Sequence, residues 1–129
     1  MVVAIIGILA TIVVVALVPA RRRSRDAKRI SDVRQLSLAL QLYREDNSQY
    51  PADIYATSSP AFFPDYLRIV PTDPNTAANY SYGVDSASNP QDYVLGAVLE
   101  SSNTALNADV DGTVFSVSCA DPTYCTQPL

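Results

Sequence analysis

Residues 1–18, MVVAIIGILATIVVVALV, form an unbroken apolar run in which Thr11 carries the only polar side chain. An α-helix of 18 residues is about 27 Å long, close to the roughly 30 Å hydrocarbon core of a bilayer. A helix that packs on a globular domain would carry a polar stripe, and this run has none. The run therefore predicts a helix that lies in lipid or in the dry core of an assembly.

A second helical pattern follows this run without a clear break. After Pro19, side chains recur at steps of three or four and form a one-sided stripe that consists of Ile30, Val33, Leu36, Leu40, Tyr43 and Asn47. The pattern stops at Tyr50, because a residue that precedes a proline is biased away from the helical region. We therefore predict one helix of about 45 residues, on the order of 70 Å long. Pro19 should kink or locally loosen this helix.

Charge is distributed unevenly along the chain, whose 129 residues have a formal net charge of −4. Residues 21–44 carry eight Arg or Lys against two Asp, a net of +6, and residues 45–129 carry one Arg against eleven Asp or Glu, a net of −10. A basic block can bind nucleic acid, but a solvated helix face, or a partner for acidic groups and lipid phosphates, is the better interpretation. We expect no nucleic-acid partner and define the basic helix patch as Arg21, Arg22, Arg23, Arg25, Lys28 and Arg29.

The rest of the chain predicts a connector followed by a small sheet. Residues 51–79 contain five of the nine prolines and four side chains apolar enough to pack on the helix stripe, namely Phe62, Phe63, Tyr66 and Leu67. Alternating patterns between turn residues predict strands at 80–84, 92–100 and 112–119. The predicted fold class is therefore α+β, with a long N-terminal helix packed on an antiparallel meander of about three strands.

We divide the chain into four parts on this basis. They are the half of the helix that lies in lipid or in the core of an assembly (1–20), its amphipathic half (21–50), an αβ-loop (51–79), and the β-sheet head with the C-terminal tail (80–129).

Two cysteines, Cys119 and Cys125, lie close together in a proline-containing tail. A metal clip would lack ligands, since there is no His and no other Cys, and such a pair suits an oxidising, extracytoplasmic compartment. We therefore predict a disulfide. Asp109-Val-Asp-Gly112 resembles part of a calcium loop, which makes Asp109 and Asp111 metal candidates, although an ordinary Asp-Gly hairpin turn is the alternative. We expect no other cofactor.

Signatures of catalysis are missing from the sequence. The chain has no His, one Lys and no Gly-rich phosphate loop, and its serines have no general base other than carboxylates. We therefore expect that the protein is not an enzyme.

Several segments together resemble the type IV pilins and the pseudopilins of type II secretion. The helix contributes VVAIIGILATIV (2–13), AKRISDVRQL (27–36) and LQLYREDNSQYP (40–51), and the rest contributes VPTDP (70–74), YSYG (80–83) and YVLGAVLE (93–100). The apolar run alone would be a weak signal, but the combination is specific and covers most of the chain. Within this family, the part of the chain after the helix is most similar to major-pseudopilin-like subunits.

The resemblance implies a type IV pilin-like fold and a structural role. It implies a single-pass subunit of the cytoplasmic membrane that has an extracytoplasmic head and polymerises through its apolar helix into a periplasmic or extracellular filament. The implied partners are further copies of the chain, the membrane before assembly, the assembly machinery and prepilin peptidase. The mature form in this family is methylated at its N-terminus, and some members hold calcium in a C-terminal loop, which Asp121 can approach here.

The start of the sequence departs from the family pattern. The family has a basic leader, a glycine, a phenylalanine and a nearby glutamate, none of which is present, so we expect that the leader and the first residues of the mature helix are missing. Basic residues after a span normally mark the cytoplasmic side, which conflicts with an external head. We follow the family, because a basic leader would outweigh the cluster that begins at Arg21.

Two questions of function stay open at this point. The filament is either a secretion pseudopilus or a surface pilus, and in both cases we expect helices to pack closely at Gly7, Ala10, Thr11 and Pro19. The alternative is a single-pass anchored binding module that never polymerises.

Overall fold

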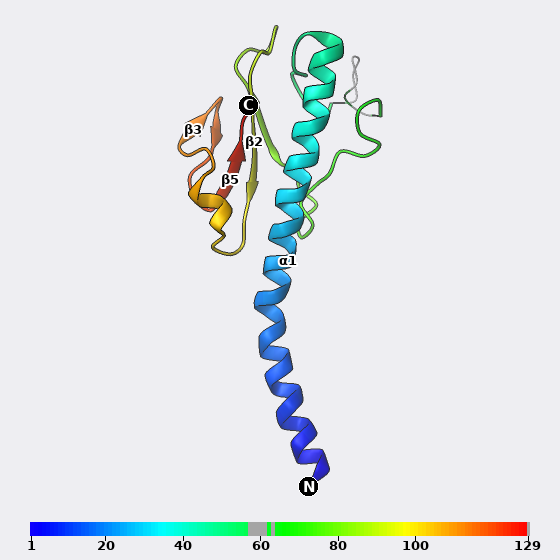
Figure 1. Cartoon of the computed structure of the whole chain (residues 1–129), viewed down its shortest axis with the longest axis vertical. Coiled ribbons are helices and arrows are strands. Elements are labelled where there is room, and N and C mark those ends of the chain that lie inside the picture. The colour runs from blue at the N-terminus through cyan, green and yellow to red at the C-terminus, as the bar shows by residue number, and fades with distance from the viewer. Residues whose placement is uncertain (57–61, 63, 129) are drawn as a thin grey trace.

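The chain folds into one long N-terminal helix with a small head on its C-terminal half (Figure 1). The structure is a computed structural model and describes residues 1–56, 62 and 64–128. Its elements are helix α1 (Val2–Asn47), strands β1 (Ser81–Val84) and β2 (Tyr93–Val98), the 3₁₀ helix η1 (Thr104–Asn107), and strands β3 (Thr113–Val114), β4 (Val117–Ser118) and β5 (Thr123–Thr126). The predicted α+β class is confirmed.

Helix α1 is 46 residues long, and it ends where the sequence predicts. Pro19 lies inside the helix and does not interrupt it; the helix is only gently curved (Figure 1). At its C-terminal end Ser48 adopts the left-handed conformation, with φ of 60°, and its N–H donates to the carbonyl oxygen of Arg44 at 2.7 Å. This is the usual geometry of a helix C-cap, here without glycine. Tyr50 and Pro51 then lead the chain away from the helix axis.

The main sheet has three antiparallel strands in the order β1-β2-β5. The first two correspond to the predicted strands at 80–84 and 92–100, with Tyr82 opposite Leu95. The prediction of a third strand at 112–119 is wrong, because this segment folds back on itself as the separate β3–β4 hairpin. The third strand is instead β5 in the tail, where Cys125 lies opposite Gly96. The sheet is therefore not a simple meander.

The β3–β4 hairpin reverses over Phe115 and Ser116, which have φ of 46° and 66°. Two consecutive residues with positive φ are typical of a type I′ turn, which Asn and Gly normally encode. Phe-Ser gives no such signal, which is why the sequence reads as one strand. The hairpin also lies close to β1: a Cβ atom on Gly83 would come within 2.5 Å of the carbonyl oxygen of Phe115. Gly83 is therefore required for this close approach.

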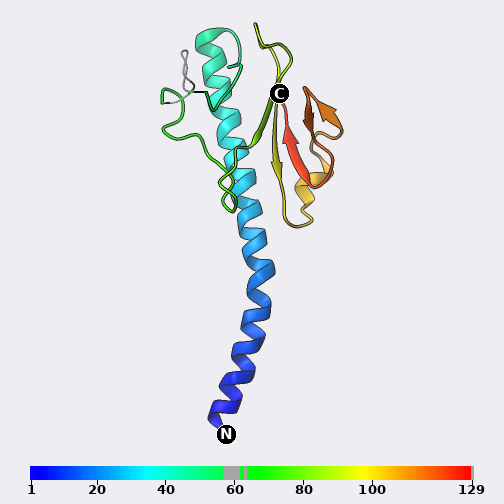
Figure 2. The same ribbon diagram turned by 180° about the vertical axis from the view of Figure 1, so that it is seen from behind.

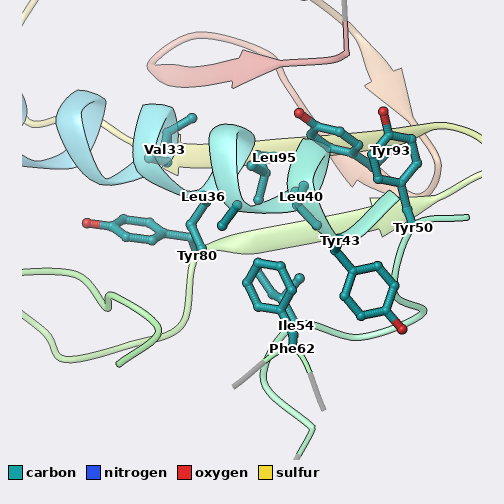
Figure 3. Close-up of a cluster of buried hydrophobic side chains, with 12 residues drawn as sticks. Val33, Leu36, Leu40, Tyr43, Tyr50, Ile54, Phe62, Tyr80, Tyr93 and Leu95 are labelled. Atoms are coloured by element: carbon teal, nitrogen blue, oxygen red, sulfur yellow. The ribbon is translucent and has the colours of Figure 1, made fainter. Parts of the chain in front are cut away.

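The hydrophobic core lies between α1, β2 and the αβ-loop (Figure 3). Its largest members are Val33, Leu36, Leu40 and Tyr43 of α1, Tyr93 and Leu95 of β2, and Tyr50, Ile54, Phe62 and Tyr80 of the connecting segments. The predicted stripe on α1 is thus buried, except that Asn47 is exposed. Strand β2 is buried on both faces, since Val94 on its other face packs with Cys119 and Cys125.

The αβ-loop is packed against this core as predicted. Phe62 is buried and Tyr66 and Leu67 are partly buried against the cluster, with the Tyr66 ring centroid 5.1 Å from that of Tyr43. Phe63, which was expected to pack here too, lies outside the described residues. Further along, a β-bridge between Thr72 and Asn79 closes a turn. This turn presents Asp73 to the helix.

Candidate functional site: an exposed apolar helix and the ion-pair cluster above it

The N-terminal half of α1 projects away from the head (Figure 2). Its large hydrophobic side chains are all exposed, from 42% at Leu17 to 82% at Val3. By length and composition, α1 is able to cross a membrane. An apolar surface of this extent marks a site that lipid or other protein covers.

The four predicted packing residues, Gly7, Ala10, Thr11 and Pro19, are all exposed on this half. A Cβ atom on Gly7 would meet nothing within 4 Å, so a larger side chain fits the isolated chain without strain. The Thr11 hydroxyl donates to the carbonyl oxygen of Gly7 at 2.8 Å. Its polar group is therefore satisfied within the helix, as a dry environment requires.

The predicted basic patch separates into two groups. Arg21, Arg22 and Arg23 are exposed and form no salt bridge with any residue that the structure describes. The other three bind carboxylates: Arg25 pairs with Glu100, Lys28 with Asp32, and Arg29 with Asp26, Asp73 and Glu100. The patch is therefore not one solvated face, because its second half connects the helix to the head.

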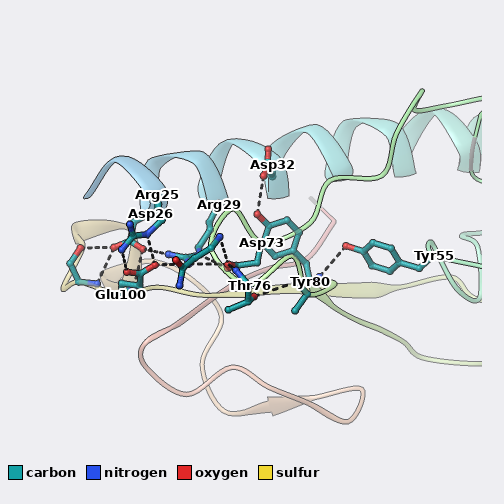
Figure 4. Close-up of polar contacts among 12 residues, drawn as sticks. Arg25, Asp26, Arg29, Asp32, Tyr55, Asp73, Thr76, Tyr80 and Glu100 are labelled. Atoms are coloured by element: carbon teal, nitrogen blue, oxygen red, sulfur yellow. Dashed lines mark hydrogen bonds and ion pairs between the residues drawn. The ribbon is translucent and has the colours of Figure 1, made fainter. Parts of the chain in front are cut away.

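The ion-pair cluster consists of Arg25, Asp26, Arg29, Asp73 and Glu100 (Figure 4). Arg29 is its centre, and its side chain is only 3% exposed. The guanidinium donates to Asp73 at 2.6 Å, to Glu100 at 2.7 Å and to Asp26 at 2.8 Å. Arg25 donates to both oxygens of Glu100, through Nε to Oε1 at 2.8 Å and through Nη2 to Oε2 at 2.5 Å. One buried arginine thus joins the helix, the αβ-loop and the segment after β2.

Asp26 is fully buried and accepts hydrogen bonds from the chain that follows β2. The N–H groups of Glu100 and Ser101 donate to it at 2.8 and 2.9 Å, and the Ser101 hydroxyl donates at 2.5 Å. A buried charge is tolerated only when its partners replace water in this way. Asp26 therefore fixes the end of β2 to the helix by both charge and backbone contacts.

The cluster shifts the pKa values of its own members. The bond to Arg29 holds the pKa of Asp73 well below its usual range, and Arg25 and Arg29 lower the pKa of Glu100 to about 2. Burial acts to raise the pKa of Asp26, but hydrogen bonds from Ser101, Glu100 and Arg29 outweigh it, so this pKa is lowered too. All three carboxyl groups are therefore ionised at neutral pH.

A second polar contact lies one turn further along the helix. Tyr80 donates to Asp32 at 2.8 Å (Figure 4). Lys28 donates to the other carboxylate oxygen at 2.5 Å. Burial and the bond to Asp32 raise the pKa of the Tyr80 phenol. The backbone N–H of Tyr80 donates to the Tyr55 hydroxyl, which itself donates to the carbonyl oxygen of Pro71. This contact fixes the start of β1 and the αβ-loop to α1.

The tail contains the two cysteines and the acidic candidates together. Cys119 and Cys125 form a disulfide that is almost completely buried. Carboxylate oxygens of Asp109, Asp111 and Asp121 lie within 4.8 Å of one another. One oxygen of Asp109 accepts the N–H of Cys125 at 2.9 Å, and its other oxygen is buried without a hydrogen-bond partner among the described residues. The hairpin turn lies at 115–116, so Asp111-Gly112 is not the hairpin turn that the alternative required.

Sequence reasoning identified the cations of the ion-pair cluster and missed its anions. Local signals were present for two contacts, since Asp26 and Arg29 are spaced i,i+3 and Lys28 and Asp32 are spaced i,i+4. Asp73 was interpreted only as a turn residue, and Glu100 only as the end of a strand. No local pattern indicates a contact between residues more than 40 positions apart.

One relative of established function was found by comparison with known proteins. The chain is 36% identical over 80 residues to Type II secretion system core protein G of Escherichia coli (strain K12). The match covers 62% of this chain, which spans about half the length of that relative (50%). No family model matches the chain. No solved structure matches it either. The similarity confirms the resemblance to secretion pseudopilins that the sequence segments indicate.

Proposed function

We propose that the chain is a structural, non-enzymatic subunit of a filament, with residues 1–20 as its membrane span before assembly and as filament core afterwards. The head stays outside the membrane and coats the filament surface. Its partners are further copies of the same chain and, by the resemblance, the assembly machinery and prepilin peptidase. Its location before assembly is the cytoplasmic membrane, which it spans once.

The exposed apolar half of α1 is the observation that carries this proposal. The head packs on the C-terminal half of α1 only. No described residue of the chain covers the apolar N-terminal half. In lipid, apolar burial gives no net drive for association, and close packing of small residues replaces it. Gly7 and Ala10 provide such a surface, and Thr11 adds no unsatisfied polar group to it.

The similarity to a type II secretion core protein favours a pseudopilus over a surface pilus. The alternative from another class is a single-pass anchored binding module that uses the same span without polymerising. The two differ in one requirement: a filament needs small residues on α1, whereas an anchor needs only apolar ones.

Substitution of Gly7 tests this requirement directly. Gly7→Leu should insert into membranes normally but form few or no filaments, whereas Gly7→Ala should keep most of them. Because a Cβ atom at this position has no described neighbour within 4 Å beyond the local helix backbone, the loss of filaments reports on contacts between chains. Electron microscopy of cells that carry the assembly machinery is the measurement. Normal filaments from Gly7→Leu would favour the lone anchor.

We also propose that Asp109, Asp111 and Asp121 bind a calcium ion at the base of the tail. The support is the convergence of three carboxylates and the buried, unpartnered oxygen of Asp109. Oxygen ligands of this kind suit Ca²⁺. Added Ca²⁺ should raise the melting temperature of the head through mass action, and Asp111→Asn should reduce this rise while Asp85→Asn leaves it intact. An equal rise in both variants would exclude the site.

A further inference from the structure

Arg21, Arg22 and Arg23, here called the arginine belt, are cations that the head does not use. Asp26 on the helix and Glu100 on the head are already paired with Arg25 or Arg29. The belt residues are exposed and without a salt bridge in the part of the chain that the structure describes. Their counter-charge must therefore come from another molecule.

The belt begins where the apolar half of α1 ends. Residues 2–20 carry no charged side chain, and Arg21 is the first of three consecutive charges, which are costly inside the hydrocarbon core of a bilayer. When this segment spans a bilayer, the belt therefore lies at the level of the lipid headgroups. Arginine suits this level, because its apolar stem can lie along the acyl boundary while its guanidinium stays among the phosphates.

The geometry of the belt suits a surface that surrounds the helix. Consecutive residues on an α-helix are about 100° apart, so three arginines in sequence point toward most of the circumference. Lipid headgroups surround a helix that spans a bilayer, whereas a single partner protein would contact one side of it. The planar guanidinium group binds two oxygens of a phosphate at once.

We propose that the arginine belt binds the phosphates of anionic phospholipids on the head side of the membrane. This inference rests on the proposed membrane anchor. The belt places three positive charges between an anionic bilayer surface and the part of the chain after residue 44, whose net charge is −10 with one Arg against eleven Asp or Glu. It sets the depth of the span, and a subunit that leaves the bilayer for a filament must first release these lipids.

The experiment uses the full chain in vesicles of phosphatidylcholine that contain phosphatidylglycerol. Spin-labelled forms of both lipids report which one associates with the protein. The wild-type chain should prefer phosphatidylglycerol by about fivefold for each arginine that reaches the surface. The preference should fall toward unity in 1 M NaCl, where screening is strong. The variant R21Q/R22Q/R23Q should show no preference.

Arg34→Gln is the matched control, because Arg34 is also exposed but lies at least 11 residues beyond the belt, roughly 17 Å along the helix. This distance exceeds the Debye length of about 8 Å at physiological salt, so the control should keep the wild-type preference. A triple variant that keeps the preference, or an equal loss in Arg34→Gln, would overturn the proposal.

Vesicle flotation separates failure of the belt from failure of the anchor. A wild-type chain that does not float with these vesicles overturns the membrane anchor and the belt with it. A wild-type chain that floats with them but shows no lipid preference overturns the belt proposal alone. A triple variant that keeps its lipid preference but no longer forms filaments would assign the belt to a second copy of the chain instead.

Discussion

The burial of the two halves of α1 is the reverse of what their hydropathy suggests. The apolar half, residues 2–18, exposes all of its large hydrophobic side chains. The polar half buries nine residues, and three of them are the charged residues Asp26, Arg29 and Asp32. In the single chain, the most apolar segment is therefore outside and charged groups are inside.

This difference shows that burial depends on what a neighbouring element offers. The C-terminal half of α1 contacts carboxylates, phenols and an apolar sheet face of its own head, so its buried charges have partners and its apolar stripe is covered. The N-terminal half has no such neighbour among the described residues. Lipid or other chains would cover it in the membrane-anchored filament subunit that we propose.

Loss of Arg29 should give the largest decrease in stability, because Arg29 is the cation that allows the C-terminal half of α1 to bury carboxylates. Arg29→Ala leaves Asp26, Asp73 and Glu100 without their shared cation, and removal of one partner from a buried pair costs about 3–5 kcal/mol. Urea unfolding of the detergent-solubilised chain, followed by near-UV circular dichroism of its tyrosines, measures this cost. The control is Arg22→Ala, because Arg22 is exposed and forms no salt bridge with a described residue; it should change stability by less than about 0.5 kcal/mol. Equal unfolding curves would show that the carboxylates reach solvent without penalty.

Reduction of the Cys119–Cys125 disulfide should have a smaller effect, confined to the head. The bridge joins cysteines six positions apart, and the chain-entropy model assigns about 2 kcal/mol to so short a loop. For a domain of this size the melting temperature should fall by roughly 10 °C. The far-UV helical signal of residues 2–20 should persist, since the disulfide lies far from that half of α1. Mass spectrometry of native material must show the bridge, and two free thiols would contradict an extracytoplasmic head.

Acid should weaken the junction between helix and head more gradually. The pKa of Glu100 is lowered from 4.5 to about 2, so its stabilising contribution is complete above pH 4.5 and is lost as the pH falls toward 2. Asp73 has a pKa that lies well below its usual range, so most of the cluster should survive at pH 3. Melting temperatures measured between pH 5 and 2 should decline, and Glu100→Gln should flatten that decline. A decline of the same slope in Glu100→Gln would assign it to other carboxyl groups.

The parts of the fold that the sequence predicts are those with local signals. The apolar run, the stripe at steps of three and four, and Tyr50-Pro51 define α1 and its end within a few residues. The strand pairing of β5 has no such signal, because it depends on contacts with β2 across the intervening hairpin. The β3–β4 hairpin has no local sequence signal either, because Phe115 and Ser116 take positive φ although neither residue favours it.

The candidate site was likewise predictable only in part from the sequence. Arginines in sequence are visible as a block, but which of them bind the head depends on where the αβ-loop brings Asp73 and where β2 ends at Glu100. Helical phase alone does not separate the belt from the cluster. Only the tertiary structure shows that Arg25 and Arg29 are occupied while Arg21–Arg23 remain exposed.

Thr11 should give the smallest effect, and it tests whether the N-terminal half of α1 is complete in its polar contacts. Its hydroxyl already donates to the Gly7 carbonyl oxygen, so it needs no partner from another chain. Thr11→Val removes that hydroxyl and keeps the branched shape, while the Gly7 carbonyl retains its helical hydrogen bond. Membrane insertion and filament yield should therefore stay within about threefold of wild type, because a lost hydrogen bond of this kind averages only ~0.6 kcal/mol in membranes. Counts of filaments by electron microscopy, beside those of Gly7→Leu, give the comparison. A loss as large as that of Gly7→Leu would mean that Thr11 bonds to a neighbouring helix, and that this half of α1 is joined by polar contacts as well as by packing.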